Sequence, residues 1–242
     1  MKKKIVDNIK TIFWALLIAL FIRSFFFQPF YIPSSSMEPN LLIGDRLFVS
    51  KYTYGFSRHS FPFSPNFSNK RFFSMKPERG DVIVFKTPAD NRTDYIKRLI
   101  GLPSDTIQFI DGKIFLNEKE IVKEKQNLSL KINCGDLDFN AEIFEETLPN
   151  GISFLTAYNS SGTLKNTDKY VVPEDHYFFM GDNRDCSKDS RFLGSVGYVS
   201  FVNLVGKARV IFFSNDKSIG NFFKFWKWNL SLRIERFFKK IK

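Results

Sequence analysis

The hydrophobic pattern begins with an apolar run near the start of the chain. Residues 11–22 are almost all apolar, and four lysines lie among the first ten residues. A helix from about Ile5 to Arg23 would reach roughly 27 Å, close to the thickness of a bilayer's hydrocarbon core. The pattern predicts one uncleaved N-terminal transmembrane helix, with its lysine-rich end in the cytoplasm. A removable signal peptide is disfavoured, because the residues that follow lack the small side chains of a cleavage site. A buried core helix is the other alternative, and the lysines before the apolar run disfavour it.

After the anchor, the pattern changes from helical to extended. We expect an extended segment at the membrane surface, followed by three turn-and-strand units, at residues 25–32, 41–49, 79–85 and 94–101. Period-two alternation places Tyr95, Lys97 and Leu99 on one face of the last strand. Lys97 therefore shares its face with apolar side chains. Residues 52–75 hold six phenylalanines without a clean period. These rings either cover a sheet or enter lipid, and the nearby anchor favours lipid.

The second half of the chain begins with a polar, alternating stretch. In residues 108–170, short strand-like segments are separated by Asp-Gly, Asn-Gly and Ser-Gly turns at 111–112, 150–151 and 161–162. This pattern predicts a small inserted β-subdomain. Core strand character returns at 171–180 and again at 199–205. The dense polar run between these two segments, at 181–191, is expected to lie against the core.

Charge decides how the C-terminus is interpreted. The chain has a formal net charge of +11, and residues 222–242 hold seven basic residues and one acidic residue. Their apolar residues recur at helical spacing, which predicts a helix. A basic helix rich in Trp and Phe is typical of an anionic membrane surface. A nucleic-acid-binding tail is the alternative, but the anchor would hold this end outside the cytoplasm. We therefore expect a phospholipid membrane as a partner and no nucleic acid.

A group of three serines provides the first candidate for chemistry. They follow Pro33, just beyond the anchor, in the run Ser-Ser-Ser-Met-Glu-Pro at 34–39. A serine hydroxyl needs a base within hydrogen-bond reach to act as a nucleophile. The chain has only two histidines, His59 and His176, and neither lies in a motif typical of a Ser-His-Asp triad. Lys97 is the remaining candidate, because apolar surroundings disfavour a charged ammonium and lower its pKa.

Metal chemistry has little support in the sequence. A calcium loop needs carboxylates or amides at alternate positions, and residues 181–191 do not provide them. Two distant histidines and two distant cysteines, Cys134 and Cys186, do not form a metal-binding pattern. We expect no metal and no cofactor. The sequence leaves open whether the two cysteines pair, and we expect no catalytic role for either.

Several motifs together resemble those of bacterial type I signal peptidases, which are Ser-Lys proteases. The first is the serine box at 34–39. The others are Tyr-Ile-Lys-Arg at 95–98 with Gly-Leu-Pro-Ser-Asp at 101–105, and Gly-Asp-Asn-Arg-Asp at 181–185 with the Ser, Asp-Ser and Arg that follow. The resemblance extends from Phe30 to about Val210 and is weakest over 108–170. Two positions depart from the family's common residues: Asn40, where threonine is frequent, and Cys186, where asparagine is.

The resemblance implies a role for each matching residue. Ser36 would be the nucleophile, Lys97 the general base, and Ser34 an oxyanion-hole donor together with Ser36. Ser187 would orient the base, and ion pairs would hold the motifs together through Arg98, Asp182, Asp189 and Arg191. Substrate would bind as an added β-strand. The residues expected to contact it are Phe30, Ile32, Pro33, Met37, Leu41, Asp94, Tyr95 and Ile96.

The resemblance also implies the fold and location of the protein. It predicts a mostly β protein with the antiparallel fold of signal peptidases and repressor proteases, an inserted β-subdomain and one N-terminal transmembrane helix. The expected parts are an anchor (1–27), a catalytic domain (28–107 and 171–215), an insert (108–170) and a membrane-surface segment (216–242). The catalytic domain would face the periplasmic side of a bacterial inner membrane. There it would cut exported preproteins after small-x-small motifs.

Two alternatives from other classes remain. A self-cleaving repressor uses the same dyad but would carry a DNA-binding domain in place of the anchor. An inactive, membrane-anchored binding homologue would be expected to lose Ser36, Lys97 or Ser187, and all three are present. Oligomeric state and the choice of preprotein are not encoded in any pattern that we can interpret.

Overall fold

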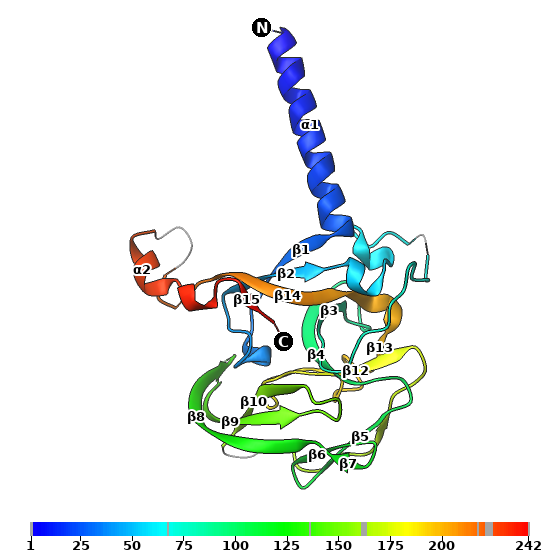
Figure 1. Ribbon diagram of the computed structural model, residues 1–242, viewed down its shortest axis with the longest axis vertical. Helices are drawn as coiled ribbons and strands as arrows, with labels where there is room; N and C mark the ends of the chain where they lie inside the picture. The colour runs from blue at the N-terminus through cyan, green and yellow to red at the C-terminus, as the bar shows by residue number, and fades with distance from the viewer. Residues whose placement is uncertain are drawn as a thin grey trace.

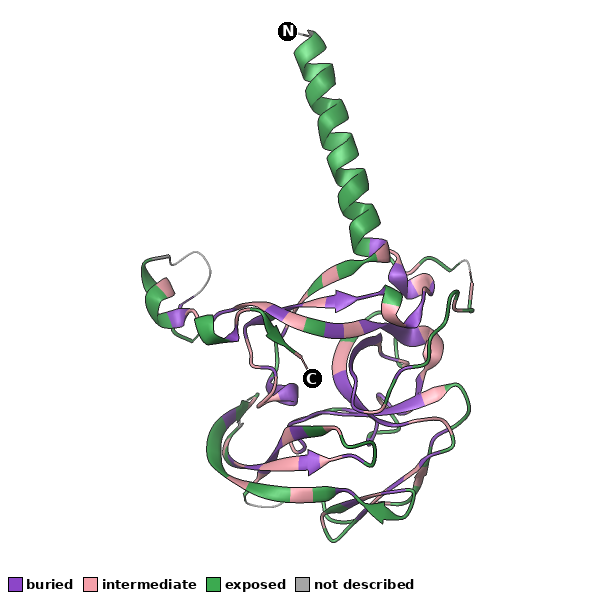
Figure 2. Cartoon of the chain, in the orientation of Figure 1, coloured by how far each residue is buried: buried purple, intermediate pink, exposed green. Residues whose placement is uncertain are grey.

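A long helix stands away from a mostly β body. The computed structural model describes residues 2–66, 68–135, 137–160, 164–216, 218–220 and 225–241. Helix α1 (Lys2–Phe25) projects from one end of the body (Figure 1). Figure 2 shows it exposed along almost its whole length. Its stretch Lys3–Phe25 is long and apolar enough to cross a membrane, and an 18-residue window within it has a mean hydropathy of 1.9. The predicted helix is confirmed, and it extends a few residues further at each end.

The largest sheet has eight strands and curls around the core. All its strand pairs are antiparallel. The order is β1 (Phe27–Tyr31), β2 (Asp45–Ser50), β14 (Leu204–Ser214), β3 (Val82–Lys86), β4 (Asp94–Gly101), β12 (His176–Met180) and β13 (Val199–Ser200), with β15 (Lys239–Lys240) beside β14. The expected strand at 94–101 is present with the same bounds.

Strand β3 shows why this sheet has two apolar faces. Val82 and Val84 pack in a cluster with the β1–β2 side of the sheet. Ile83 and Phe85 pack on the opposite face, with residues of β12 and β13. A strand that is buried on both faces reads as a continuous apolar run, which is the pattern seen at Val-Ile-Val-Phe.

Two smaller sheets complete the β body. The order in one is β11 (Tyr170–Val171), β5 (Thr106–Ile110), β6 (Lys113–Leu116) and β7 (Lys119–Glu120). In the other it is β10 (Ser153–Asn159), β9 (Leu137–Thr147) and β8 (Val122–Cys134). The expected turns at 111–112 and 150–151 connect strands, and Asp111, Gly112 and Gly151 have positive φ. The expected turn at 161–162 lies outside the described residues. Figure 1 shows β8 and β9 as a long curved ribbon.

The continuous C-terminal helix that we predicted is wrong for the described residues 225–241. This segment contains short helical turns, η5 (Phe225–Lys227), α2 (Trp228–Ser231) and η6 (Ile234–Arg236), before β15. Arg236 is buried and forms an ion pair with Asp45, 2.6 Å apart, and β15 pairs with β14. These tertiary contacts override the helical spacing of the apolar residues. Residues 222–224 and 242 of the predicted helix lie outside the described residues.

The single strand expected at 199–205 is also wrong. A helical turn, η4 (Phe201–Asn203), separates β13 from β14. The guanidinium of Arg71 donates to the carbonyls of Phe201 and Val202, each at 3.2 Å, and to that of Leu204. These carbonyls therefore accept hydrogen bonds from a side chain. In a continuous strand they would accept them from the backbone of a neighbouring strand.

The phenylalanine-rich segment 52–75 divides into two groups of rings. Phe56 and Phe61 pack edge-on against Phe25 at the end of α1, with ring centroids 5.4 and 5.5 Å away. Phe63 and Phe73 are exposed, and Phe67 lies outside the described residues. Part of the segment thus supports the base of α1, and Figure 1 shows the backbone of the segment at this end of the helix.

Candidate active site

The serine box folds into a short helical turn, η1 (Ser35–Met37). Met37 and Leu41 are fully buried, and Leu41 N donates to the Met37 carbonyl, so the apolar residues of the box fix the turn in the core. Asn183 secures its other side: its backbone N–H donates to Ser36 O and its amide to Ser35 O, both at 3.1 Å. The turn leaves the Ser36 hydroxyl facing β4.

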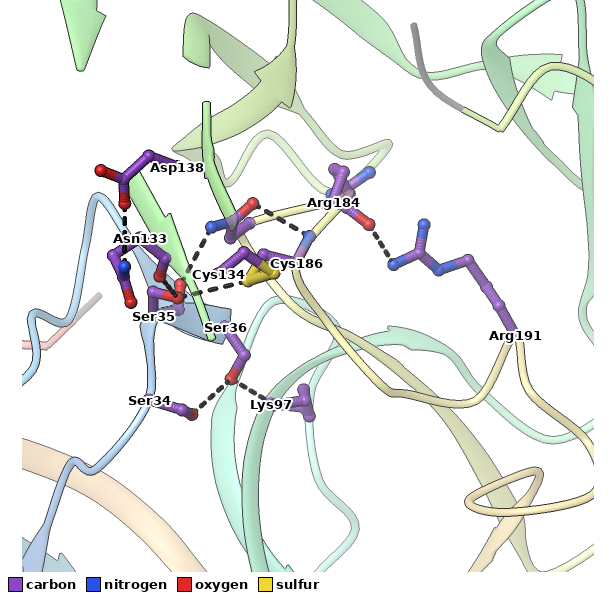
Figure 3. Close-up of a disulfide and its surroundings, with 11 residues drawn as sticks. Ser34, Ser35, Ser36, Lys97, Asn133, Cys134, Asp138, Arg184, Cys186 and Arg191 are labelled. Atoms are coloured by element: carbon purple, nitrogen blue, oxygen red, sulfur yellow. Dashed lines mark hydrogen bonds between the residues drawn. A yellow bond between two sulfur atoms is a disulfide. The ribbon is translucent and has the colours of Figure 1, made fainter. Parts of the chain in front are cut away.

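Lys97 meets Ser36 from the middle of β4. Its Nζ lies 2.6 Å from Ser36 Oγ and donates a second hydrogen bond to the Ile96 carbonyl at 3.1 Å. Figure 3 shows the two side chains pointing toward each other. Both are enclosed, because only 7% of Ser36 and 4% of Lys97 is exposed. The predicted face is also observed, since Lys97 Nζ lies 5.5 Å from the centre of the Tyr95 ring.

The surroundings of Lys97 favour its neutral form. Burial lowers the pKa of the ammonium to about 8; the carboxylates of Asp189 and Asp182 oppose this change, and Arg191 adds to it. No carboxylate within the described residues forms a direct ion pair with Lys97. A neutral amine at hydrogen-bond distance from a serine hydroxyl can accept its proton, which is the arrangement that general-base catalysis requires.

Two of the predicted ion pairs lie around the dyad. Arg98, on the face of β4 opposite to Lys97, contacts Asp182 through Nε at 2.7 Å and Nη2 at 2.8 Å. Arg191 contacts Asp189 in the same two-pronged way, at 2.8 and 2.9 Å. Burial opposes ionisation of Asp189, but Arg191 and several hydrogen bonds hold its pKa below the ordinary value. The first pair joins β4 to the loop 181–191, and the second fixes the loop internally.

Ser187 does not contact Lys97 directly. Its hydroxyl donates to Asp189 Oδ2 at 2.7 Å, and no hydrogen bond links it to Lys97 within the described part of the chain. Both Ser187 and the serine turn pack closely on Gly181, because a Cβ added there would meet Ser187 Oγ at 2.2 Å and the Ser36 carbonyl oxygen at 2.5 Å. Any side chain at position 181 would thus separate the serine turn from the loop. In this arrangement Ser187 contacts Asp189, whose carboxylate opposes the lowering of the Lys97 pKa.

Ser34 lies at the exposed edge of the dyad. Its hydroxyl donates to Ser36 Oγ over 3.4 Å, a long hydrogen bond that leaves it free to turn toward a group bound above Ser36. The adjacent Ser35 points the other way: its hydroxyl donates to the Asn133 carbonyl at 2.6 Å and lies 3.3 Å from Cys186 Sγ (Figure 3). The three serines thus have separate surroundings.

Most of the expected substrate contacts lie together. One apolar cluster contains Ile32, Met37 and Leu41, with Phe30 and Ile96 packed against it. Met37 and Leu41 have almost no exposed surface, so they lie inside this cluster. Tyr95 packs in the cluster on the other side of β4. Pro33 and Asp94 are exposed.

The strand edges next to the dyad are available for pairing. Strand β12 pairs with β4 only from Arg98 onward, so residues 94–96 have no partner on that side among the described residues. Strand β1 is the outermost strand of its sheet, and beyond it Ile32 pairs with the Gly44–Asp45 turn. Each of the two segments therefore has a backbone edge to which an extended peptide could add.

Both departures from the family pattern contact the motifs. Asn40 Nδ2 donates to Asp182 Oδ2 and to the Leu155 carbonyl, each at 2.7 Å. Cys186 forms a disulfide with Cys134 at the end of β8. Sequence reasoning missed Asn183, although it lies inside the quoted motif. Its neighbours gave no signal that an amide would be needed to tie the loop to the serine turn.

The histidines lie outside this arrangement. Burial, together with Arg58 and Lys86, lowers the pKa of His59 to about 4, and its Nδ1 is 3.0 Å from Ser64 Oγ. His176 is partly exposed at the start of β12, with Nδ1 2.8 Å from the Glu174 carbonyl. Neither forms a hydrogen bond with a serine of the 34–36 run.

Comparison with known proteins shows which family the chain resembles. The family model described as signal peptidase, peptidase S26, matches residues 5–213. A signal peptidase I of Rickettsia typhi is 40% identical over 257 residues, which cover 99% of this chain and 95% of that protein. A signal peptidase I of Rickettsia massiliae is 41% identical over 244 residues, covering 93% and 88%. The crystal structure of a signal peptidase I from Enterococcus faecalis is 28% identical, covers 55% of this chain and 97% of that one, and has a TM-score of 0.33.

Proposed function

The chain belongs to the peptidase S26 family of signal peptidases, and from that premise we propose that Ser36 and Lys97 are the dyad of its active site. Family membership makes the protein a serine endopeptidase that acts on signal peptides of preproteins. The observation that carries the dyad assignment is the 2.6 Å separation of Lys97 Nζ and Ser36 Oγ in an enclosed site.

In the proposed reaction, Lys97 acts first as a base and then as an acid. Its neutral amine takes the proton of Ser36 while Oγ attacks the carbonyl carbon of the scissile bond. The ammonium then gives that proton to the leaving amine, and the signal peptide remains attached to Ser36 as an ester. A water molecule, deprotonated by Lys97, hydrolyses the ester and restores the hydroxyl.

The developing oxyanion would be stabilised by two hydrogen-bond donors. These are the Ser34 hydroxyl and the backbone N–H of Ser36. The Ser34 hydroxyl bonds only weakly to Ser36 Oγ in the free site, so it can turn to the new negative charge. A donor that becomes fully engaged only in the transition state increases the rate more than it tightens substrate binding.

Substrate is proposed to bind as a strand between residues 30–33 and 94–96. Side chains of alternate substrate residues would point toward the cluster that contains Ile32, Met37 and Ile96. Because Met37 closes the floor of this region, only small side chains fit immediately before the cut and two residues upstream. This geometry supports cleavage after small-x-small sequences, such as Ala-x-Ala.

We propose that α1 crosses the bacterial inner membrane once, with its N-terminus in the cytoplasm. The lysines precede the apolar residues, and positively charged ends stay inside. The catalytic body would then lie outside, where signal peptides of exported proteins emerge. A reporter that is active only outside the cytoplasm should work when fused after the last residue and fail when fused near Lys4. The opposite result would overturn this orientation.

A cleavage assay tests the dyad assignment. The full-length protein in detergent is incubated with a secreted precursor, and the cut site is read from the product mass. Ser36→Ala should abolish cleavage while the protein stays folded. Ser35→Ala is the matched control, because that hydroxyl faces Asn133 and should leave cleavage measurable. Cleavage by Ser36→Ala at a rate near that of the parent would exclude Ser36 as the nucleophile.

A further inference from the structure

A cationic cavity lies beside the base of α1, apart from the dyad. Its volume is about 410 Å³. Four basic side chains line it, namely Arg23, Lys51, Lys86 and Arg92, against the single carboxylate of Asp94. Lys86 Nζ pairs with Asp94 at 2.9 Å, so one positive charge is neutralised. Three positive charges remain without an acidic partner among the described residues.

Lys51 is the unusual member of this group. Only 2% of it is exposed, and its Nζ donates one hydrogen bond, to the Ser60 carbonyl at 2.6 Å. Burial, and then the nearby Arg23, lower its pKa to about 8. An ammonium has three N–H donors, and burying one without an anion is costly. A bound anion would remove that cost and raise the pKa of Lys51 again.

Uncharged hydrogen-bond donors also line this cavity. Arg58 Nε donates to His59 Nε2 at 3.3 Å, which assigns the ring proton to Nδ1. Nδ1 then donates to Ser64 Oγ at 3.0 Å, so the hydroxyl hydrogen of Ser64 remains available. Gln28 and Asn91 also line the wall. Two guanidinium groups, an ammonium, a hydroxyl and amide groups form a set of donors suited to phosphate oxygens.

The position of the cavity indicates where the phosphate would come from. Arg23 lies in the last turn of α1, directly after the apolar residues that are long enough to cross a membrane. Phe61 and Phe63 line the cavity as well, and Phe63 is fully exposed. Exposed aromatic rings and arginines beside a transmembrane helix belong at the level of the lipid headgroups.

We propose that this cavity binds the phosphate of an anionic phospholipid, with Lys51 and Arg23 as the main charged contacts. Phe30 and Asp94 also line it, so it adjoins the end of the proposed substrate strand that is farther from Ser36. A lipid bound there would hold the base of α1 and this end of the groove against the membrane.

Thermal unfolding of the full-length protein in detergent tests the proposal. Phosphatidylglycerol and phosphatidylcholine with the same acyl chains are titrated separately, and their apparent affinities are compared. We expect phosphatidylglycerol to raise the unfolding temperature at a concentration about tenfold or more below that of phosphatidylcholine. Lys51→Met should remove this preference. Lys123→Met, on the distant β8, removes the same charge and should retain it.

The remaining outcomes are decisive as well. If Lys51→Met does not fold, Arg23→Gln, at an exposed position, must weaken phosphatidylglycerol binding several-fold. Equal stabilisation by inorganic phosphate and by phosphatidylglycerol would show a site for free anions and overturn the lipid assignment. If Lys51→Met raises the KM for precursor equally in both lipids and leaves lipid binding unchanged, the cavity binds the substrate and the proposal is wrong. The lipid-binding measurements do not depend on catalysis, so they would be unchanged if Ser36 proved not to be the nucleophile.

Discussion

Lys97→Arg is the substitution that separates a Ser-Lys enzyme from one with another base. Arginine keeps the positive charge and much of the length of lysine. Its guanidinium stays protonated at any usable pH, so it cannot take the proton of Ser36. The variant should fold and show no measurable cleavage. A histidine base, by contrast, would leave the variant active.

In the parent enzyme, the size of the change of kcat/KM with pH follows from the pKa of Lys97. With a pKa of about 8, about one Lys97 in eleven is neutral at pH 7 and about ten in eleven at pH 9. An ordinary lysine, with a pKa of about 10.4, would be neutral in only about one molecule in 2,500 at pH 7. We therefore expect kcat/KM to rise about tenfold from pH 7 to pH 9, with an acidic limb centred near pH 8.

The assay measures precursor cleavage by full-length protein in detergent from pH 6 to 10. Lys51 is the necessary control, because burial and Arg23 lower its pKa to about 8 as well. Lys51→Arg should keep the acidic limb, whereas Lys97→Arg should have no activity from which to measure one. His59 cannot produce this limb, since its pKa is lowered to about 4. A limb that disappears in Lys51→Arg, or an active Lys97→Arg, would refute the assignment of Lys97 as the base.

The same pKa predicts an effect on stability with a definite sign. Because the pKa of Lys97 is lower in the folded than in the unfolded protein, the unfolded chain binds the extra proton between about pH 8 and 10.4. Stability from this group therefore rises with pH across that window and is lowest below it. Lys97→Met should be inactive yet more stable at pH 7, by up to about 3 kcal/mol. The difference should shrink toward pH 10.4 in thermal unfolding.

Three further predictions concern the neighbours of the dyad. Ser34→Ala should lower kcat by about 10² to 10³ with little change in KM, which steady-state kinetics would reveal; an unchanged kcat would remove Ser34 from the oxyanion hole. Asp182→Asn should destabilise the fold by about 3–5 kcal/mol in denaturant unfolding, because it removes the negative charge that faces the buried Arg98 guanidinium. Glu142→Gln, in an exposed pair, should cost less than about 1 kcal/mol. Reducing the Cys134–Cys186 disulfide, which closes a 52-residue separation, should lower stability by about 4 kcal/mol and should not abolish cleavage.

Sequence patterns predicted the helices and strands whose formation depends on neighbouring residues in the chain. The anchor follows from the length of its apolar run. Strand β4 follows from the alternation of side chains between its two faces, over the residues from the preceding turn to Gly101. The same alternation correctly placed Lys97 among apolar neighbours, which is the feature that later lowers its pKa. The motifs selected Ser36 and Lys97 as the dyad that we propose, and their distance of 2.6 Å adds the geometry that a linear sequence lacks.

The errors arose where distant contacts decide the local structure. The C-terminal residues have helical spacing, but Arg236 pairs with Asp45 across 191 positions and β15 joins the sheet. Cys134 and Cys186 could not be paired from the sequence, because the curved β8–β9 ribbon brings them together. Asn40 presented the same problem, since its contact with Asp182 spans 142 positions. None of these contacts has a signal in the neighbouring residues.

The buried charges around the proposed dyad favour Lys97 over the neighbouring cations as the group that gives up its proton. Arg98, Arg184 and Arg191 each have a carboxylate at 2.7 or 2.8 Å, and a guanidinium does not lose its proton in a protein. Lys97 forms its hydrogen bonds with the neutral oxygens of Ser36 and the Ile96 backbone. Since the nearby carboxylates are already engaged by guanidinium groups, they hold the proton on Lys97 only weakly. Burial therefore dominates its pKa, and the arginine pairs that stabilise the loop also keep the base free to accept a proton.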